Sequence, residues 1–422
     1  MMNADLIRLG ENARRAAGAL MVAAAPAKNA ALEAIARTLE ENAAEIFAAN
    51  AEDIAAGKAA GIAPNLLDRM LLDEKRLAGI VEGVRQVAAL KDPIGEVLHA
   101  ETLPNGLIVS QMRVPLGVVG MIYEARPNVT VDAAVLCLKS GNAVILRGSK
   151  DILRSNICLV KLMRQALTEA GLDPDCIALV EDPSRETATA FMKLSGYLDV
   201  LSPRGGAGLI RSTVENATVP VIETGTGNCH VYVDKAADLA KAVSIIVNAK
   251  ASRPSVCNAE EVCLVHRDVA AQFLPLLKKA IVDDRAAAGL VPVELRLDPA
   301  AARIIGGTPA GERDFDTEFL DYILAVGVVD SVDAAIAHIA AHSTHHSDCI
   351  VTEDAAAAKK FTEQVDSAAV YVNVSTRFTD GGEFGLGCEM GISTQKLHAR
   401  GPMGLDELCT YKYVVRGSGQ IR

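Results

Sequence analysis

Positive charge and aromatic side chains are scarce in this chain of 422 residues. It holds 42 Lys and Arg against 53 Asp and Glu, a formal net charge of −11, and only 4% of its residues are aromatic, with no Trp. This balance argues against a protein that binds nucleic acid or an anionic membrane, because both need basic surface to meet phosphate groups. No apolar run reaches the ~20 residues of a membrane-spanning helix. A local basic pocket for a small anion remains compatible with the composition.

Familiar ligand-binding signatures are also missing. The sequence contains no G-x-G-x-x-G after a strand, no phosphate loop and no H-E-x-x-H. Its nine cysteines are an odd number without dense spacing, which is typical of reduced thiols in a cytoplasmic protein. An alanine-rich stretch after Arg14 and Arg15 mimics a short signal peptide. Because Asp5 and Glu11 precede it and a helical pattern resumes at Asn29, we expect no export.

Hydrophobic periodicity divides the chain into distinct regions. Residues 4–90 show helical spacing with breaks at Pro26, 57–61 and Pro64. Residues 97–116 read as two strands joined at Pro104-Asn105-Gly106, a hairpin signal. Short apolar strands then alternate with helices, which predicts a parallel sheet that 219–222 and 231–233 extend. A second alternating region runs to about residue 374, and 408–415 again resembles a strand. The predicted class is α/β.

Two loops follow predicted strands and contain glycine. Residues 144–150 (VILRGSK) and 202–208 (SPRGGAG) lie where backbone N–H groups at a strand-to-helix junction can approach a pyrophosphate. Arg147 and Lys150 precede the first acid, Asp151, and a cation at this place favours the 2′-phosphate of NADP(H) over the ribose of NAD. The alternative interpretation is a pair of ordinary turns with exposed charges.

Two cysteines six positions apart raise a choice between metal, redox and nucleophilic chemistry. Their spacing fits neither a redox pair nor a zinc site. Cys263 lies inside the apolar run 262–265, as a buried thiol does, whereas Cys257 follows Pro254 in a loop that enters that strand. Cys257 is therefore the candidate nucleophile, which requires an electropositive environment. A second cluster is open to interpretation as a metal site or as a solvated helix end: His338, His342, His345, His346 and Cys349. We predict no metal.

Five segments together resemble one family. They are VPLGVVGMIYEARPNV (114–129), ETGTGNCH (223–230), RPSVCN (253–258), FGLG (384–387) and GISTQKLHARGPMG (391–404). On these motifs the chain resembles the gamma-glutamyl phosphate reductases, a family of the aldehyde dehydrogenase superfamily, over essentially its whole length. The resemblance implies a Rossmann-like cofactor domain, a smaller α/β catalytic domain and a β-hairpin arm. It places the NADP-binding domain at 1–96 and 117–236, the catalytic domain at 237–380 and the oligomerisation arm at 97–116 and 405–422.

The resemblance also assigns residues. It implies that Cys257 is the nucleophile and that Asn128 helps to form the oxyanion hole. Glu223 takes the place of the glutamate that activates water in hydrolytic relatives, and here we expect a proton shuttle or a structural role. Cofactor contacts are implied for Arg147, Ser149, Lys150, Gly205, Gly206 and Glu383. Arg253 and Arg377 are candidates for binding the anionic substrate.

The implied reaction is the NADPH-dependent reduction of L-glutamyl 5-phosphate to glutamate 5-semialdehyde in proline biosynthesis, with release of phosphate and a thioester on Cys257. A homo-oligomer, dimer or tetramer, is expected from the arm. A complex with a glutamate 5-kinase is a further expectation. The rival interpretations are a hydrolytic or CoA-linked aldehyde dehydrogenase, and a non-catalytic partner of that kinase.

Overall fold

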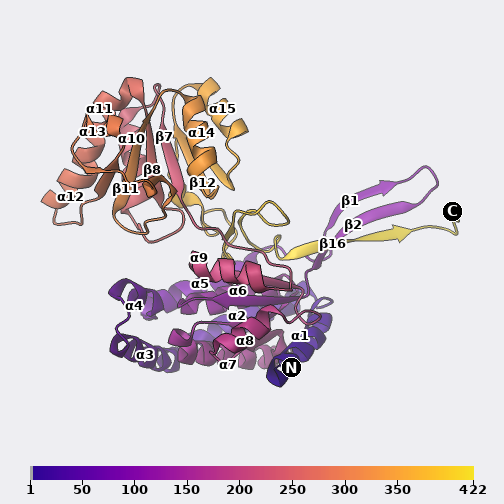
Figure 1. Cartoon of the computed structure of the whole chain (residues 1–422). Coiled ribbons are helices and arrows are strands. Elements are labelled where there is room, and N and C mark those ends of the chain that lie inside the picture. Colours follow the sequence, from indigo (N-terminus) through magenta and orange to yellow (C-terminus); the bar gives the residue numbers. More distant parts are fainter. Residues whose placement is uncertain (1–2) are drawn as a thin grey trace. The chain divides into compact units, whose positions relative to one another are not determined.

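The computed structural model of the protein describes residues 3–422, apart from the side chain of Asn65. Contacts within the chain divide it into two compact units (Figure 1). The first combines the chain up to Thr224 with Gly385–Gly391 and Met403–Arg422. The second combines Gly225–Phe384 with Ile392–Pro402. The functional assignment of domains from the sequence stays a prediction.

Helices form the start of the first unit. The predicted helical spacing is confirmed, but Pro26 lies in the first turn of a helix rather than at a break. Proline is tolerated there because its missing N–H has no partner within the helix. None of the helices in the described part of the chain has the length and apolar character that a bilayer span needs. The helices are α1 (Ala4–Leu20), α2 (Ala25–Glu41), α3 (Ala43–Ala59), α4 (Pro64–Met70) and α5 (Glu74–Ala89).

A four-stranded parallel sheet organises the rest of the first unit. Its order is β5-β4-β3-β6, and every residue of β3 is buried, as in a sheet covered on both faces. Residues of α1 and α8 pack on one face, among them Ala17 of the alanine-rich stretch that mimics a signal peptide. The elements are β3 (Val118–Tyr123), α6 (Pro127–Lys139), β4 (Ala143–Arg147), η1 (Lys150–Ile152), α7 (Leu153–Glu169), η2 (Pro174–Cys176), β5 (Ile177–Leu179), α8 (Arg185–Met192), β6 (Val200–Arg204) and α9 (Ala207–Asn216).

A three-stranded antiparallel sheet forms the arm of the first unit. Strands β1 (Val97–Thr102) and β2 (Ile108–Pro115) make the predicted hairpin, and β16 (Cys409–Arg416) pairs with β2 along its full length. The turn between β1 and β2 and the C-terminus lie at the same end of this sheet (Figure 1). All six residues of β1 are exposed.

A seven-stranded parallel sheet forms the second unit, in the order β10-β9-β11-β8-β7-β12-β13. Helices α10 and α11 pack on one face, and α14 and α15 on the other (Figure 1). Its elements are β7 (Cys229–Val233), α10 (Leu239–Ala251), β8 (Glu260–His266), α11 (Arg267–Lys278), η3 (Lys279–Asp283), α12 (Asp284–Ala287), β9 (Glu294–Leu297), α13 (Pro299–Ala302), β10 (Thr308–Pro309), η4 (Asp314–Asp316), β11 (Ile323–Val329), α14 (Val332–His342), β12 (Ser347–Val351), α15 (Ala355–Gln364), β13 (Ala369–Val372), η5 (Thr376–Phe378), β14 (Ile392–Ser393) and β15 (Gly401–Pro402).

One strand lies in a different sheet from the one predicted. The sequence predicted that 231–233 extends the first sheet, but β7 pairs with β8 and β12 in the second. A short, fully buried strand carries no pattern that identifies its neighbours. The α/β class with parallel sheets is confirmed.

Candidate active site

The loop that carries Cys257 joins α10 to β8 in the second unit. The Cys257 side chain is partly exposed, whereas Asn258 after it is buried. The Asn258 amide nitrogen donates to the carbonyl oxygens of Arg377, at 3.2 Å, and Thr379, at 2.9 Å. The Thr376 hydroxyl donates to the Asn258 carbonyl at 2.8 Å. These bonds fix the residue next to Cys257 against the η5 segment, and the sequence alone did not assign Asn258 any role.

The residues that lead into β7 contact the other side of this loop. A Cβ built on Gly227 would lie 1.4 Å from the Cys257 carbonyl oxygen, so only glycine allows the two backbones to approach this closely. The Gly227 N–H donates to the Glu318 carboxylate at 2.8 Å. The Cys229 thiol donates to the Cys257 carbonyl oxygen at 3.2 Å. Cys257 is therefore held between β7 and the η5 segment.

Two arginines bring positive charge near Cys257. A guanidinium nitrogen of Arg377 donates to the Asn258 side-chain oxygen, and its Nε is buried without a hydrogen-bond partner among the described residues. Burial lowers the pKa of Arg377 and the charge of Arg253 lowers it further, whereas the Asp380 carboxylate and a Cys257 thiolate raise it. The charge of Arg377 thus interacts with that of Arg253 and with a Cys257 thiolate. Within residues 3–422, neither arginine forms an ion pair.

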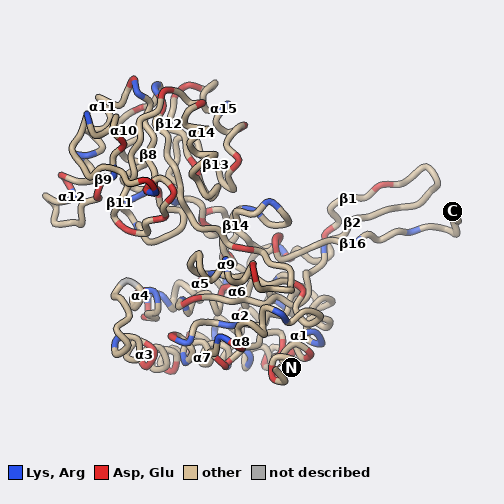
Figure 2. The backbone as a smooth tube through the Cα atoms, viewed as in Figure 1, with Lys and Arg blue, Asp and Glu red and all other residues tan. Residues whose placement is uncertain are grey.

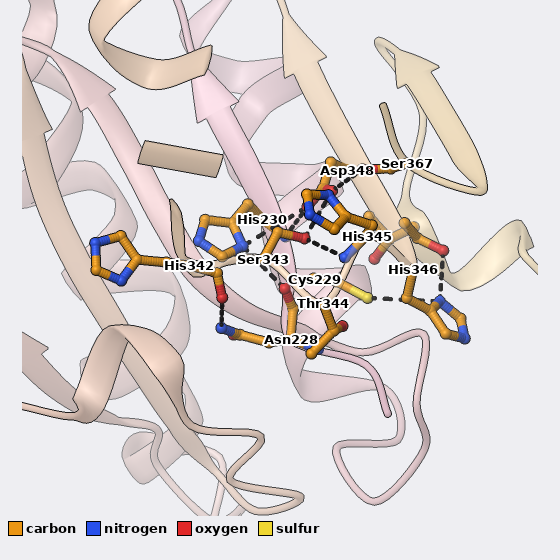
Figure 3. A network of polar contacts seen from close by, with 12 residues as sticks. Asn228, Cys229, His230, His342, Ser343, Thr344, His345, His346, Asp348 and Ser367 are labelled. Atoms are coloured by element: carbon orange, nitrogen blue, oxygen red, sulfur yellow. Dashed lines mark hydrogen bonds and ion pairs between the residues drawn. The ribbon is translucent and has the colours of Figure 1, made fainter. Parts of the chain in front are cut away.

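A network of polar contacts joins the amino ends of β7 and β12 (Figure 3). Asp348 accepts hydrogen bonds from the His230 N–H at 2.8 Å, from the Ser343 hydroxyl at 2.8 Å and from the Ser367 hydroxyl. Burial raises the pKa of Asp348 to about 6, and these bonds oppose the shift. The Asn228 amide nitrogen donates to the His342 carbonyl at 2.8 Å. This network fixes the strands beside the Cys257 loop.

The histidines near β12 occupy different environments. His346 is fully buried, and burial lowers its pKa to about 4. His338 lies against His342, with ring centroids 4.4 Å apart, and burial lowers the pKa of His338 to about 3. The interpretation as a solvated helix end is therefore wrong for His346, which is fully buried, whereas His338 is partly exposed. Across residues 3–422, no group of three or more His, Cys, Asp or Glu is arranged to hold a metal ion.

The predicted oxyanion-hole residue lies in the first unit. Asn128 is the second residue of α6, and its amide nitrogen donates to the Asp132 carboxylate at 2.9 Å. Burial raises the pKa of Asp132 to about 6, while the charge of Arg204 and the bond from Asn128 lower it. This bond orients the Asn128 amide. The motifs of the sequence assigned Asp132 no role, although it lies one helical turn after Asn128.

The predicted cofactor residues of the first unit lie at the carboxyl ends of parallel strands. Arg147 ends β4, and its guanidinium donates to the carbonyls of Pro183 and Ser184 at 2.8 Å and 3.1 Å. Its Nε is buried without a hydrogen-bond partner in the described part of the chain. Lys150 is exposed, and the Ser149 hydroxyl bonds to the Asp151 carboxylate at 2.8 Å.

The second glycine loop follows β6 and leads into α9. The Gly206 N–H donates to the Glu124 carboxylate at 3.0 Å, and a Cβ on Gly205 would lie 2.6 Å from that carboxyl carbon. An anionic group thus accepts from the start of α9, which is typical of a helix N-terminus. Because β4, β3 and β6 are neighbours, both predicted cofactor loops lie at one edge of the sheet.

The remaining predicted residues lie in two units. Glu223 is partly buried and precedes Thr224, whose hydroxyl donates to the Pro203 carbonyl at 2.9 Å in the first unit. Glu383 belongs to the second unit and is exposed, and its N–H donates to the Asp380 carboxylate at 3.4 Å. The structure therefore brings together Cys257, Arg253 and Arg377, and separately the two cofactor loops.

The family of the chain follows from comparison with known proteins. A model described as the aldehyde dehydrogenase family matches residues 2–289. A solved acetylating aldehyde dehydrogenase from Geobacillus thermoglucosidasius shares the fold at a TM-score of 0.74 and 18% identity, over 99% of this chain and 97% of that one. The chain belongs to the aldehyde dehydrogenase family and is an oxidoreductase.

More similar relatives identify a branch of this family. The gamma-glutamyl phosphate reductases of Streptococcus gordonii and of Neisseria meningitidis serogroup C are each 62% identical to this chain, over 94% of it and 94% of their own lengths. The crystal structure of the gamma-glutamyl phosphate reductase of Thermotoga maritima matches with a TM-score of 0.94 and 46% identity, over 99% of both chains. The chain belongs to the gamma-glutamyl phosphate reductases, which confirms the resemblance drawn from its motifs.

Proposed function

We propose that the protein reduces L-glutamyl 5-phosphate with NADPH to glutamate 5-semialdehyde and phosphate, in proline biosynthesis. The observation that carries this proposal is the placement of Cys257, whose partly exposed thiol lies in a loop fixed on both sides and near two arginines without ion pairs. A thiol becomes a nucleophile in such an electropositive, accessible setting. The names of the relatives supply the substrate.

Covalent catalysis by Cys257 divides the reaction into two steps. The thiolate attacks the acyl phosphate carbonyl, the carbon–oxygen bond to phosphate breaks, and a thioester forms on Cys257. The Asn128 amide, oriented by Asp132, stabilises the negative charge that develops on the carbonyl oxygen. Glu223 serves as a proton shuttle for the leaving semialdehyde. Water attack on the thioester is unproductive in this direction, so Glu223 is not the base of a hydrolysis.

Polar groups of the chain that lack hydrogen-bond partners support the proposed cofactor site. The buried, unpartnered Nε of Arg147 and the exposed ammonium of Lys150 fit the 2′-phosphate of NADPH, with Ser149 beside them. The Gly205 and Gly206 loop fits the pyrophosphate, because its N–H already binds a carboxylate. Glu383 is assigned to the nicotinamide ribose. NADPH, when bound, supplies the hydride that reduces the thioester.

Arg377 and Arg253 are assigned to the anionic groups of the substrate. Arg377 keeps one donor, its Nε, without a partner among residues 3–422, although this atom is buried. A buried N–H that lacks a protein partner costs roughly 1–3 kcal/mol, which a phosphate or carboxylate oxygen recovers on binding. Arg253 is exposed and adds charge at the same place.

The test is NADP+ reduction with glutamate 5-semialdehyde, with and without phosphate, for the wild type, Cys257→Ser and the matched control Cys263→Ser. We expect strictly phosphate-dependent activity that Cys257→Ser abolishes and Cys263→Ser retains. Activity without phosphate would identify water or CoA as the acyl acceptor and overturn the proposal. A wild type inactive with both NAD+ and NADP+ would favour a non-catalytic role.

The arm supports a homo-oligomer. Its strands are largely uncharged (Figure 2), and they expose apolar side chains, among them Val97, Leu98, Tyr411 and Tyr413. Such a narrow sheet has little stability alone and is stabilised by a partner's sheet. Light scattering tests this, and a monomer at micromolar concentration would refute it. The kinase complex and the cytoplasmic location stay predictions.

A further inference from the structure

A second thiol lies directly against the loop of Cys257. Cys229 is fully buried at the start of β7, and its sulfur lies 3.2 Å from the Cys257 carbonyl oxygen. That oxygen is about 2.4 Å from its own Cα, so the Cys229 sulfur lies at most about 5.6 Å from the Cys257 Cα. Adding the Cys229 Cα–Sγ distance of about 2.8 Å puts the two Cα atoms at most about 8.4 Å apart, whereas a disulfide joins Cα atoms 4.4–6.8 Å apart. The disulfide therefore requires the Cys257 side chain to rotate toward Cys229.

The environments of the nine cysteines single out Cys257 for oxidation. Only Cys257 and Cys388 are not fully buried. Burial raises the pKa of the Cys388 thiol, and the carboxylate of Asp132 raises it further, so Cys388 forms a thiolate less readily than an ordinary thiol. Cys257 instead has Arg253 and Arg377 nearby, which favour a thiolate. Oxidants react with thiolates that solvent reaches.

We propose that Cys229 is a resolving cysteine that forms a reversible disulfide with Cys257 when a hydroperoxide oxidises the enzyme. This inference takes from the proposed function only that Cys257 is the reactive thiol. The site of modification is the pair of sulfurs at the amino end of β7. The disulfide blocks the nucleophile but protects it from irreversible oxidation.

The chemistry balances in two steps. The Cys257 thiolate attacks one oxygen of hydrogen peroxide, so that a sulfur–oxygen bond forms, the oxygen–oxygen bond breaks, and a sulfenic acid and a hydroxide result; the hydroxide takes up the proton that the Cys257 thiol released and becomes water. The Cys229 sulfur then attacks the Cys257 sulfur, the sulfur–oxygen bond breaks, and hydroxide leaves as water with the proton from Cys229. In sum, two thiols and one hydrogen peroxide give a disulfide and two waters.

The His346 imidazole lies beside the Cys229 thiol. Its Nδ1 lies 3.9 Å from the Cys229 sulfur and 2.8 Å from the Ser347 hydroxyl, and Figure 3 shows the imidazole beside the thiol. Burial keeps this imidazole neutral by lowering its pKa. Burial also raises the pKa of the Cys229 thiol well above its usual value, so its proton leaves with the hydroxide that the sulfenic acid releases.

The experiment treats the purified full-length wild type with hydrogen peroxide and follows three readouts: NADP+ reduction, recovery with dithiothreitol, and mass spectrometry. We expect inactivation that dithiothreitol reverses, and a tryptic species that links peptide 212–235, which holds Cys229, to peptide 251–267, which holds Cys257 and Cys263. The same linkage in Cys263→Ala assigns the bond to Cys257. Absence of the linked peptide in the wild type would overturn the inference.

Two variants of Cys229 serve as tests. Cys229→Ser keeps a donor for the Cys257 carbonyl, and its recovery is measured against its own activity before peroxide; it recovers an about tenfold smaller share of that activity than the wild type does, because its sulfenic acid proceeds to sulfinic acid. Cys229→Ala gives the same loss of recovery if the serine variant is unstable. Equal recovery in wild type and variants would refute the inference. Detection of the linked peptide does not depend on catalytic activity. It therefore tests the disulfide even if the activity assay with Cys257→Ser refutes the proposed function.

Discussion

Replacing Gly227 by alanine should displace the loop of Cys257. The new Cβ would lie 1.4 Å from the Cys257 carbonyl oxygen, 2.3 Å from its carbonyl carbon and 2.8 Å from its Cα. A normal carbon–oxygen contact is about 3.3–3.6 Å, so one backbone must move by about 2 Å. Gly227 is itself tied to Glu318, so we expect the Cys257 loop to move. Misplacing a catalytic group by ~1 Å costs about 100-fold, so kcat should fall by at least ~100-fold.

The assay measures kcat for NADP+ reduction, the rate of Cys257 alkylation by iodoacetamide, and thermal unfolding. Gly79→Ala is the control, because Gly79 is exposed within α5 and a Cβ there meets no atom within 4 Å. We expect the control to keep full activity and to gain about 1 kcal/mol, as alanine replaces glycine in a helix. A Gly227→Ala enzyme with activity within a few fold of wild type would show that the close contact does not position Cys257.

Three further substitutions test charged groups. Burial raises the pKa of Glu260 well above 4.5, so its contribution to stability is complete below pH 4.5 and is lost as pH rises. In denaturant titrations above pH 4.5, the free energy of unfolding of Glu260→Gln should therefore increase relative to that of the wild type by up to ~1.4 kcal/mol per pH unit. A difference that does not change with pH would contradict this. Arg377→Met should raise the KM of the semialdehyde by roughly 10- to 100-fold, while the surface control Arg267→Met should not; equal KM values would exclude substrate binding by Arg377. Glu124→Gln should lower the KM of NADP+ by about 2- to 5-fold, because it removes a carboxylate from the Gly206 N–H; a raised KM would assign Glu124 to cofactor binding instead.

Hydrophobic periodicity predicted much of the fold, because it indicates which residues within one segment are buried. The alternation of short strands and helices, the hairpin at 97–116 and the final strand all follow from such patterns, and the structure confirms them. The sheet to which β7 belongs could not be read in this way. Its five residues are all buried, and its neighbours β8 and β12 are set by contacts with residues far along the chain. An apolar strand pattern indicates that the strand is buried, but it does not identify the neighbouring strands.

The candidate site shows the same limit. The loop position of Cys257 and the burial of Cys263 follow from the residues around each, and the structure agrees with both placements. Its supporting contacts were missed, because Asn258 binds residues more than a hundred positions away and Cys229 contacts Cys257 across 28 positions. The bond from Asn128 to Asp132 was within reach of sequence reasoning, since residues four apart on a helix are neighbours.

The buried charges behind the Cys257 loop bear on the charge of its thiol. Lys250 and Glu261 form a fully buried ion pair at 2.5 Å, and Glu261 also accepts from the Leu320 N–H. Burial raises the pKa of Glu261 to about 8 and that of Glu260 well above its usual value. An ionised Glu260 carboxylate three residues after Cys257 would oppose a thiolate there, so burial that favours the protonated form removes one negative charge from the surroundings of Cys257. The cost of burying Glu260 therefore keeps it neutral, and its neutrality favours the ionised nucleophile.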